Sequence, residues 1–198
     1  MRGINGILIA INIAVFILQS QQPELLLPLA LWPLGAHPVP GIAWVPHFEP
    51  WQLLTYAFLH GGLAHVGLNM FALWMFGRDC ERALGARRYL MLYVAAVLSA
   101  AIVQLAVAAI SRSAYPTVGA SGGVFGVLLA YAVLFPTRRI VLLFPPIPMP
   151  AWLFVTIYGL IELANGVLGT NAGVAHFAHL GGMLGAGLVL WRWYRAAR

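Results

Sequence analysis

Charged residues are scarce in this chain. They make up 8% of its 198 residues, whereas hydrophobic residues make up 62%. Because about a quarter of the residues in an ordinary soluble domain are charged, this composition excludes a typical water-soluble globular protein. A helix needs about 20 apolar residues to cross a bilayer core, and several stretches of that kind recur here. The sequence therefore predicts a membrane protein surrounded by the lipid bilayer.

Cysteine is nearly missing, and lysine is absent. Cys80 is the only cysteine, which excludes an intramolecular disulfide and a cysteine-rich metal site, and we expect no metal ion or cofactor. Every basic residue is an arginine, and the formal net charge is +6. In a soluble protein this surplus would suggest a nucleic-acid partner. Here the arginines lie between apolar stretches, where they indicate membrane topology, so no nucleic-acid partner is expected.

The apolar stretches predict an all-α fold, a polytopic bundle of six transmembrane helices that forms a single domain over residues 1–198. The expected spans are 4–18, 51–77, 89–110, 119–135, 151–168 and 175–193. Residues 23–50 contain seven prolines, too many for a spanning helix. This segment is predicted to lie at the outer interface of the membrane.

The arginines fall on alternate connections of this six-helix arrangement. Ten lie on one side, and only Arg112 lies on the other. Because arginine is enriched on the cytoplasmic side, the pattern predicts that both termini are cytoplasmic. We expect a multi-pass protein of the cell membrane, in a bacterial inner membrane.

Four polar residues stand out inside the predicted spans, where such groups are costly and mark functional candidates. They are His65, Asn69, Ser121 and His179. Counted from the cytoplasmic arginine of each helix, Ser121, His179 and His65 lie at heights of roughly 25, 20 and 20 Å. Asn69 is one turn below His65 on the same face. This layer predicts a buried site that opens to water on the outer side.

The combination of Ser121 and His179 is suited to acyl transfer. A serine hydroxyl attacks a carbonyl when a neutral imidazole takes its proton. Ser121 lies in the first turn of its helix, where unpaired backbone N–H groups favour a developing negative charge. No carboxylate lies near His179 in the sequence or at its expected depth, so we expect a Ser–His dyad whose imidazole is oriented by packing or by a neutral group.

Small residues predict how the two helices meet. Gly122 and Gly126 in the fourth span, and Gly181 and Gly185 in the sixth, both form the small-xxx-small pattern of closely packed membrane helices. Close approach along these residues would bring the serine within reach of the histidine.

Several separated motifs resemble the rhomboid family of intramembrane serine proteases. The family's Gly-x-Ser-Gly segment appears as Gly119-Ala-Ser121-Gly122, and its Ala-His-x-x-Gly segment as Ala178-His179-Leu-Gly-Gly182. Its His-x-x-x-Asn pair appears as His65-Val-Gly-Leu-Asn69. The resemblance extends over residues 51–187 and is to a minimal six-helix core.

The resemblance implies a serine endopeptidase that cleaves transmembrane segments of membrane-anchored proteins near the outer face. It implies that Ser121 is the nucleophile and His179 the base, and that His65, Asn69 and the Ser121 backbone bind the oxyanion. The residues expected to support the site are Gly119, Gly122 and Phe125. Two positions depart from the pattern of many relatives, which have arginine where this chain has Gln52 and tyrosine where it has Phe125.

Other functions remain open at this stage. A catalytically inactive relative would bind transmembrane helices without cleaving them, and a proton or solute transporter would use His65, His179 and Glu162 as relay groups. His176 is the main rival base, three residues before His179. Glu162 is the one acid well inside a span, and it is expected to be protonated or hydrogen-bonded to another helix.

Overall fold

The computed structural model describes residues 3–35, 46–141, 146–170 and 174–197. Almost all regular structure in this part of the chain is helical, in agreement with the expected class. The principal helical segments are α1 (Ile4–Gln21), α4 (Leu63–Ala72), η3 (Leu73–Gly77), α5 (Arg78–Leu84), α6 (Ala86–Ser111), α7 (Ser121–Leu134), α8 (Ala151–Leu168) and α9 (His176–Ala196).

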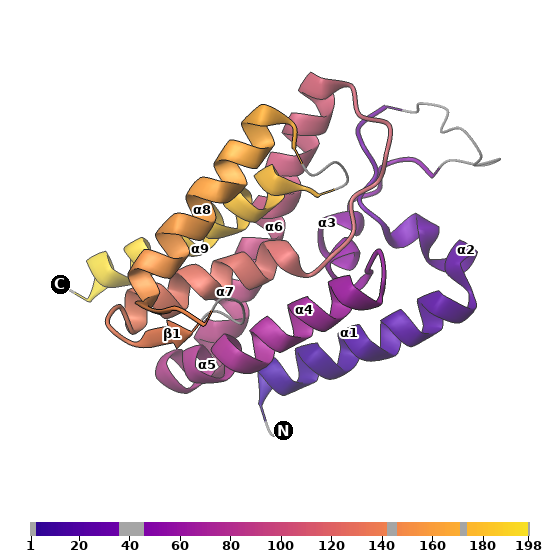
Figure 1. Cartoon of the computed structure of the whole chain (residues 1–198). Helices are drawn as coiled ribbons and strands as arrows, with labels where there is room; N and C mark the ends of the chain where they lie inside the picture. Colours follow the sequence, from indigo (N-terminus) through magenta and orange to yellow (C-terminus); the bar gives the residue numbers. More distant parts are fainter. Residues whose placement is uncertain (1–2, 36–45, 142–145, 171–173, 198) are drawn as a thin grey trace.

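Helix α7 lies in the middle of the bundle (Figure 1). It contacts α6, α9, α8 and η3, and most of its residues from Gly122 to Ala132 are buried. Because neighbours surround it, the helix has no polar face, and a continuous apolar sequence is what this position requires. Helix α1 lies on the outside and packs against α4 and η3 (Figure 1).

Among the described residues, three helices are long and apolar enough to cross a membrane: α1, α6 and α8. Helix α7 is apolar but shorter, with 14 residues. Many large apolar side chains on the outside of the bundle are exposed, including Ile110 at 85% and Leu168 at 73%. Side chains of this kind suit contact with lipid tails.

The segment predicted as one span over 51–77 has a different structure. It begins with two short pieces, α3 (Gln52–Thr55) and η2 (Tyr56–Phe58), and the long helix starts only at Leu63. The pair Gly61-Gly62 interrupts the apolar run, since glycine is a poor helix former. At the other end the helix continues past Gly77 as α5, because its arginine, glutamate, alanine and leucine residues favour helix whatever their hydropathy. The predicted boundaries were therefore wrong at both ends.

The π-helical segment η3 explains how α1 is attached. Such segments free backbone carbonyls from the regular ladder, and here the Asn5 side-chain amide donates to the Leu73 carbonyl at 2.9 Å. The Tyr89 hydroxyl donates to Asn5 Oδ1 at 2.7 Å. The carboxylate of Glu81 accepts from the N–H groups of Ile4 at 2.7 Å and Asn5 at 3.0 Å, which satisfies the start of α1. These bonds join α1 to η3, α5 and α6.

One small sheet departs from the all-α expectation. Strands β1 (Arg139–Val141) and β2 (Pro148–Pro150) form an antiparallel pair between α7 and α8. Beside it, Arg138 forms an ion pair with Asp79 of α5 at 2.7 Å. The start of α1, α5, the sheet and the end of α9 all lie toward the lower left in Figure 1.

The proline-rich segment lies toward the other end of the bundle. It contains α2 (Pro23–Leu26) and η1 (Leu27–Leu29), and residues 36–45 of the predicted outer loop lie outside the described part of the chain. Gln52 is fully buried against it. Its Nε2 donates to the carbonyls of Pro28 and His47, both at 3.0 Å, and its Oε1 accepts from the Trp32 N–H at 3.1 Å. A neutral amide therefore anchors this segment at Gln52, one of the two positions noted above as departures.

Candidate active site

Ser121 and His179 meet between α7 and α9. Ser121 is the first residue of α7, and His179 lies in the first turn of α9. Ser121 Oγ and His179 Nε2 are 2.8 Å apart. The imidazole is buried, with 8% of the residue exposed, and Ser121 is partly buried. The distance suits proton transfer from the hydroxyl to the ring.

Glycine allows this approach, through the two glycines expected on α7 but through a different glycine on α9. A Cβ on Gly182 would overlap the carbonyl of Gly122, so these two backbones are in direct contact. Gly126 also faces α9, because its Cβ would lie 3.1 Å from the Gly182 carbonyl oxygen. Gly181 and Gly185 face α6 instead. The expected pairing of Gly122 and Gly126 with Gly181 and Gly185 was therefore wrong by one residue on α9.

A carboxylate contacts the other side of the imidazole, contrary to the expected neutral group. Glu162 Oε2 of α8 lies 2.9 Å from His179 Nδ1. The prediction of a neutral partner was wrong because the depth of a residue is counted from the arginine of its own helix, and α8 contains no arginine. Counted from the start of α8 at Ala151, Glu162 is about 17 Å along its helix, close to the height of roughly 20 Å for His179. The expected hydrogen bond from Glu162 to another helix is confirmed.

His176 lies on the far side of the same carboxylate. Its Nδ1 is 2.7 Å from Glu162 Oε2, and its Nε2 is 3.1 Å from the carbonyl oxygen of Thr170. Both ring nitrogens are therefore engaged away from the serine, and the structure places His179 rather than His176 beside Ser121. The unbroken sequence of contacts runs Ser121, His179, Glu162, His176, Thr170.

Glu162, His176 and His179 are also the described residues whose side chains are placed to hold a metal ion together. Within the described ranges, Glu162, His176 and His179 offer three ligand atoms within 4.8 Å of one another. The two Nδ1 atoms are already hydrogen-bonded to the carboxylate. A metal ion bound here would therefore compete with these hydrogen bonds for the same atoms.

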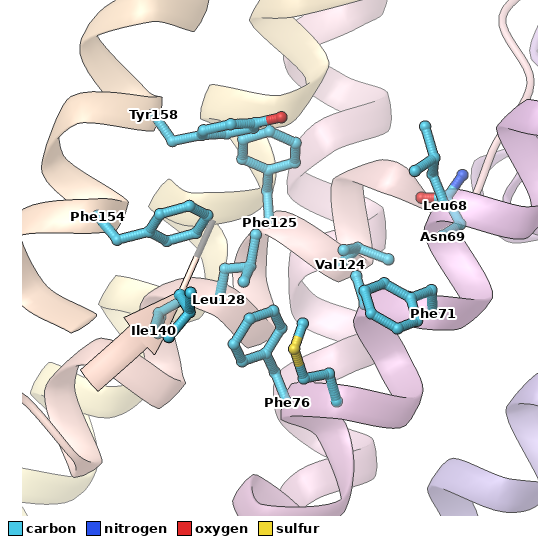
Figure 2. Close-up of a pocket in the computed structure, with 13 residues that line it drawn as sticks. Leu68, Asn69, Phe71, Phe76, Val124, Phe125, Leu128, Ile140, Phe154 and Tyr158 are labelled. Atoms are coloured by element: carbon cyan, nitrogen blue, oxygen red, sulfur yellow. The ribbon is translucent and has the colours of Figure 1, made fainter. Parts of the chain in front are cut away.

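Phe125 covers the face of the imidazole. Its ring is stacked on His179, and Tyr158 of α8 lies next to it, with ring centroids 5.5 Å apart. Figure 2 shows Phe125 and Tyr158 projecting from neighbouring helices toward the same point. Phe125 thus supplies a packing contact to the imidazole but no hydroxyl.

His65 lies beside Gly119 and close to the serine. A Cβ on Gly119 would be 2.8 Å from His65 Nε2 and 3.6 Å from Ser121 Oγ, and the glycine φ is +133°. Only glycine suits this position, because both the space and the backbone conformation exclude a side chain. The Gly61 N–H donates to His65 Nδ1 at 3.3 Å, which leaves the proton of a neutral His65 on Nε2. His65 can therefore present a donor to the region above Ser121.

Asn69 is near the site but bonded elsewhere. Its Nδ2 donates to the His65 carbonyl, one turn earlier in α4, at 3.0 Å. Asn69 also lines an apolar cavity of about 410 Å³. The continuous α4–η3 segment forms one side of this cavity, and α8 forms the opposite side. Figure 2 shows this cavity, whose wall includes Phe71, Phe76, Val124 and Phe154. Because Phe125, which is stacked on His179, also lines it, the cavity lies beside the serine–histidine pair, although neither Ser121 nor His179 forms part of its wall.

Known proteins resemble this chain over most of its length. A family model described as a Rhomboid domain matches residues 47–196. Rhomboid protein 1, mitochondrial, of Saccharomyces cerevisiae is 36% identical over 153 residues, which are 72% of this chain and 41% of that protein. Rhomboid protease GluP of Bacillus subtilis is 34% identical over 137 residues, which are 69% of this chain and 25% of that protein. The chain spans less than half the length of these relatives.

Proposed function

This chain belongs to the rhomboid family, and from that premise we propose that it is a serine endopeptidase that cleaves transmembrane segments of membrane-anchored proteins. The observation that carries the proposal is the 2.8 Å contact between Ser121 Oγ and His179 Nε2. A hydroxyl and an imidazole in a largely buried site, joined by a hydrogen bond, are the minimum for nucleophilic catalysis of acyl transfer.

The reaction begins when His179 Nε2 accepts the Ser121 proton as Oγ attacks a peptide carbonyl. The tetrahedral intermediate collapses, the C–N bond breaks, and the imidazolium returns the proton to the leaving amine. A water molecule then gives a proton to His179 and attacks the acyl-enzyme. As the ester C–O bond breaks, His179 gives this proton to Ser121 Oγ, which releases the new carboxyl terminus and restores both residues.

Donors for the oxyanion surround the serine. Backbone N–H groups in the first turn of α7 have no acceptor within their own helix, and the helix dipole favours negative charge there. His65 supplies Nε2–H from α4. Asn69 joins them if its side chain turns away from the His65 carbonyl when the substrate binds. Each donor of this kind contributes about 10²- to 10³-fold to the rate.

The cavity beside the site supports an apolar substrate. The wall of the cavity is largely aromatic and aliphatic. The cavity lies between the α4–η3 segment and α8. A peptide segment unwound from a transmembrane helix could place apolar side chains there while its backbone reaches Ser121. Separation of α8 from α4 would widen this entry, so we propose that α8 moves to admit substrate.

We propose a membrane arrangement with six spans: α1, the continuous α4–η3–α5 segment, α6, α7, α8 and α9. The arginine-rich connections and both termini would face the cytoplasm, and the serine would open to the outer side of a bacterial inner membrane. Helix α6 illustrates the polarity, since Arg87 and Arg88 lie at its start and Arg112 caps its end. Residues 23–50 would lie at the outer interface.

The proposal is tested by cleavage of a model transmembrane substrate and by labelling with a fluorophosphonate probe. Ser121→Ala and His179→Ala should each abolish both signals. Ser111→Ala, at the exposed end of α6, is the matched control and should leave both unchanged. Folded wild-type protein that neither cleaves nor labels would instead indicate an inactive relative that binds transmembrane helices.

A further inference from the structure

We propose that Glu162 and His176 form a buried pair with no net charge that holds His179 in the tautomer needed to accept the Ser121 proton. The inference rests on the proposed function and adds two positioning residues to it. Its basis is the row of four contacts that runs from Ser121 through His179, Glu162 and His176 to the Thr170 carbonyl. The ability of each atom in this row to donate or to accept limits where the protons lie.

The two ends of this row have defined roles. A backbone carbonyl only accepts, so His176 Nε2 must carry the proton that it donates to Thr170. At the other end, His179 Nε2 must be unprotonated to accept from the Ser121 hydroxyl. The proton of neutral His179 is then on Nδ1, from which it donates to Glu162 Oε2 at 2.9 Å.

The remaining contact needs one more proton. His176 Nδ1 and Glu162 Oε2 are 2.7 Å apart, and a hydrogen bond between them requires a proton on one of the two atoms. On Nδ1 it makes an imidazolium and a carboxylate, and on Oε2 it makes a neutral imidazole and a carboxylic acid. Both arrangements have zero net charge. In both, Oε2 still accepts from His179, so the tautomer is the same.

Burial explains why the pair is needed. Glu162, His176 and His179 are exposed by only 7%, 7% and 8%. A single carboxylate enclosed in this way would be costly, whereas a carboxylate sharing a proton with an adjacent imidazole is partly compensated. His176 therefore allows an acid to be placed at the depth where His179 requires an acceptor. When His179 becomes protonated during the reaction, the same oxygen stabilises the new charge.

The decisive variants are Glu162→Gln and Glu162→Asp in the full chain, assayed on a transmembrane substrate. The glutamine amide can donate to Nδ1 and stabilise the wrong tautomer. We expect kcat to fall about 10²- to 10⁴-fold, by analogy with loss of the acid in serine protease triads, while KM changes little. Aspartate retains the acceptor and should recover much of the lost kcat. His176→Phe should cause a smaller loss of kcat than Glu162→Gln.

Thr156→Val, on the exposed side of α8, is the control and should leave kcat unchanged. If Glu162→Gln retains full kcat while Ser121→Ala is inactive, this inference is overturned and the proposed function survives. If wild-type protein neither cleaves nor labels, the proposed function itself fails.

Nitrogen-15 NMR of histidine-labelled wild-type protein reads the tautomer directly, and a variant is needed only to assign the signal. The His179 signal is identified by its loss in His179→Asn. We expect the neutral ring to carry its proton on Nδ1, and a proton on Nε2 would overturn the inference.

Discussion

The Phe125 ring lies parallel to the His179 imidazole, with 4.3 Å between ring centroids and 5° between the planes. The stack restricts rotation of the imidazole about its side chain, and the Glu162 contact fixes its direction within the plane. Together they hold Nε2 toward Ser121.

Loss of this stack should lower the rate of acylation. We expect Phe125→Ala to reduce the fluorophosphonate labelling rate about tenfold, a loss equivalent to about 1.4 kcal/mol of transition-state stabilisation. Phe125→Tyr retains the ring and should label at close to the wild-type rate. Labelling kinetics of purified protein measure both effects. Equal rates for the alanine variant and wild type would show that the stack does not position the base.

The buried amide of Gln52 should stabilise the proline-rich segment. Gln52→Ala leaves the carbonyls of Pro28 and His47 and the Trp32 N–H without this partner, and it removes three hydrogen bonds. At about 1 kcal/mol each, we expect a loss of about 3 kcal/mol in the free energy of unfolding. Thermal unfolding in detergent measures the change. Gln21→Ala, at the exposed end of α1, should shift the midpoint little, and an equally small shift for Gln52→Ala would contradict the anchoring role.

The contact between Gly182 and Gly122 should not tolerate a side chain. A Cβ on Gly182 would overlap backbone, which cannot move aside without separating α9 from α7. We therefore expect Gly182→Ala to lower both the thermal midpoint and the labelling of Ser121. Gly67→Ala is the matched control, because a Cβ there would meet nothing within 4 Å. A more active or more stable Gly182→Ala protein would show that a methyl group fits between α9 and α7 at this position.

Removal of metal ions should leave cleavage unchanged. The proposed reaction uses protons of the chain itself, and Glu162 accepts from the nitrogen of His179 that a metal would need. We expect the cleavage rate to be the same before and after dialysis against EDTA. Activity that falls with EDTA and returns with added zinc would indicate that Glu162, His176 and His179 bind a metal ion instead.

Much of the site follows from local sequence. The apolar lengths predict the helices, and the motifs around Ser121 and His179 identify the two residues that the structure brings together. His65 could also be predicted near the serine, because its depth can be counted from Arg78 along one continuous helix. Each of these inferences needs only spacing within one segment and the fixed rise of a helix.

The partners of these residues depend on relations between segments. The sequence marks Glu162 as an unusual acid, but its contact with His179 depends on the depth and rotation of α8 relative to α9. The sequence also marks Gln52 as a departure, but two of its three bonds join it to Trp32 and Pro28, which lie 20 and 24 residues away. Hydropathy carries no information on such rotations.

The amino-acid sequence alone thus determined that this protein belongs in a membrane and which hydroxyl and imidazole are its functional candidates, because apolar length and residue spacing are properties of single helices. Only the tertiary structure decided that Gly182 is the point of contact with α7, and that an acid and a second histidine stand behind His179. Those facts arise from how one helix is turned against the next, which is set by the packing of the whole bundle.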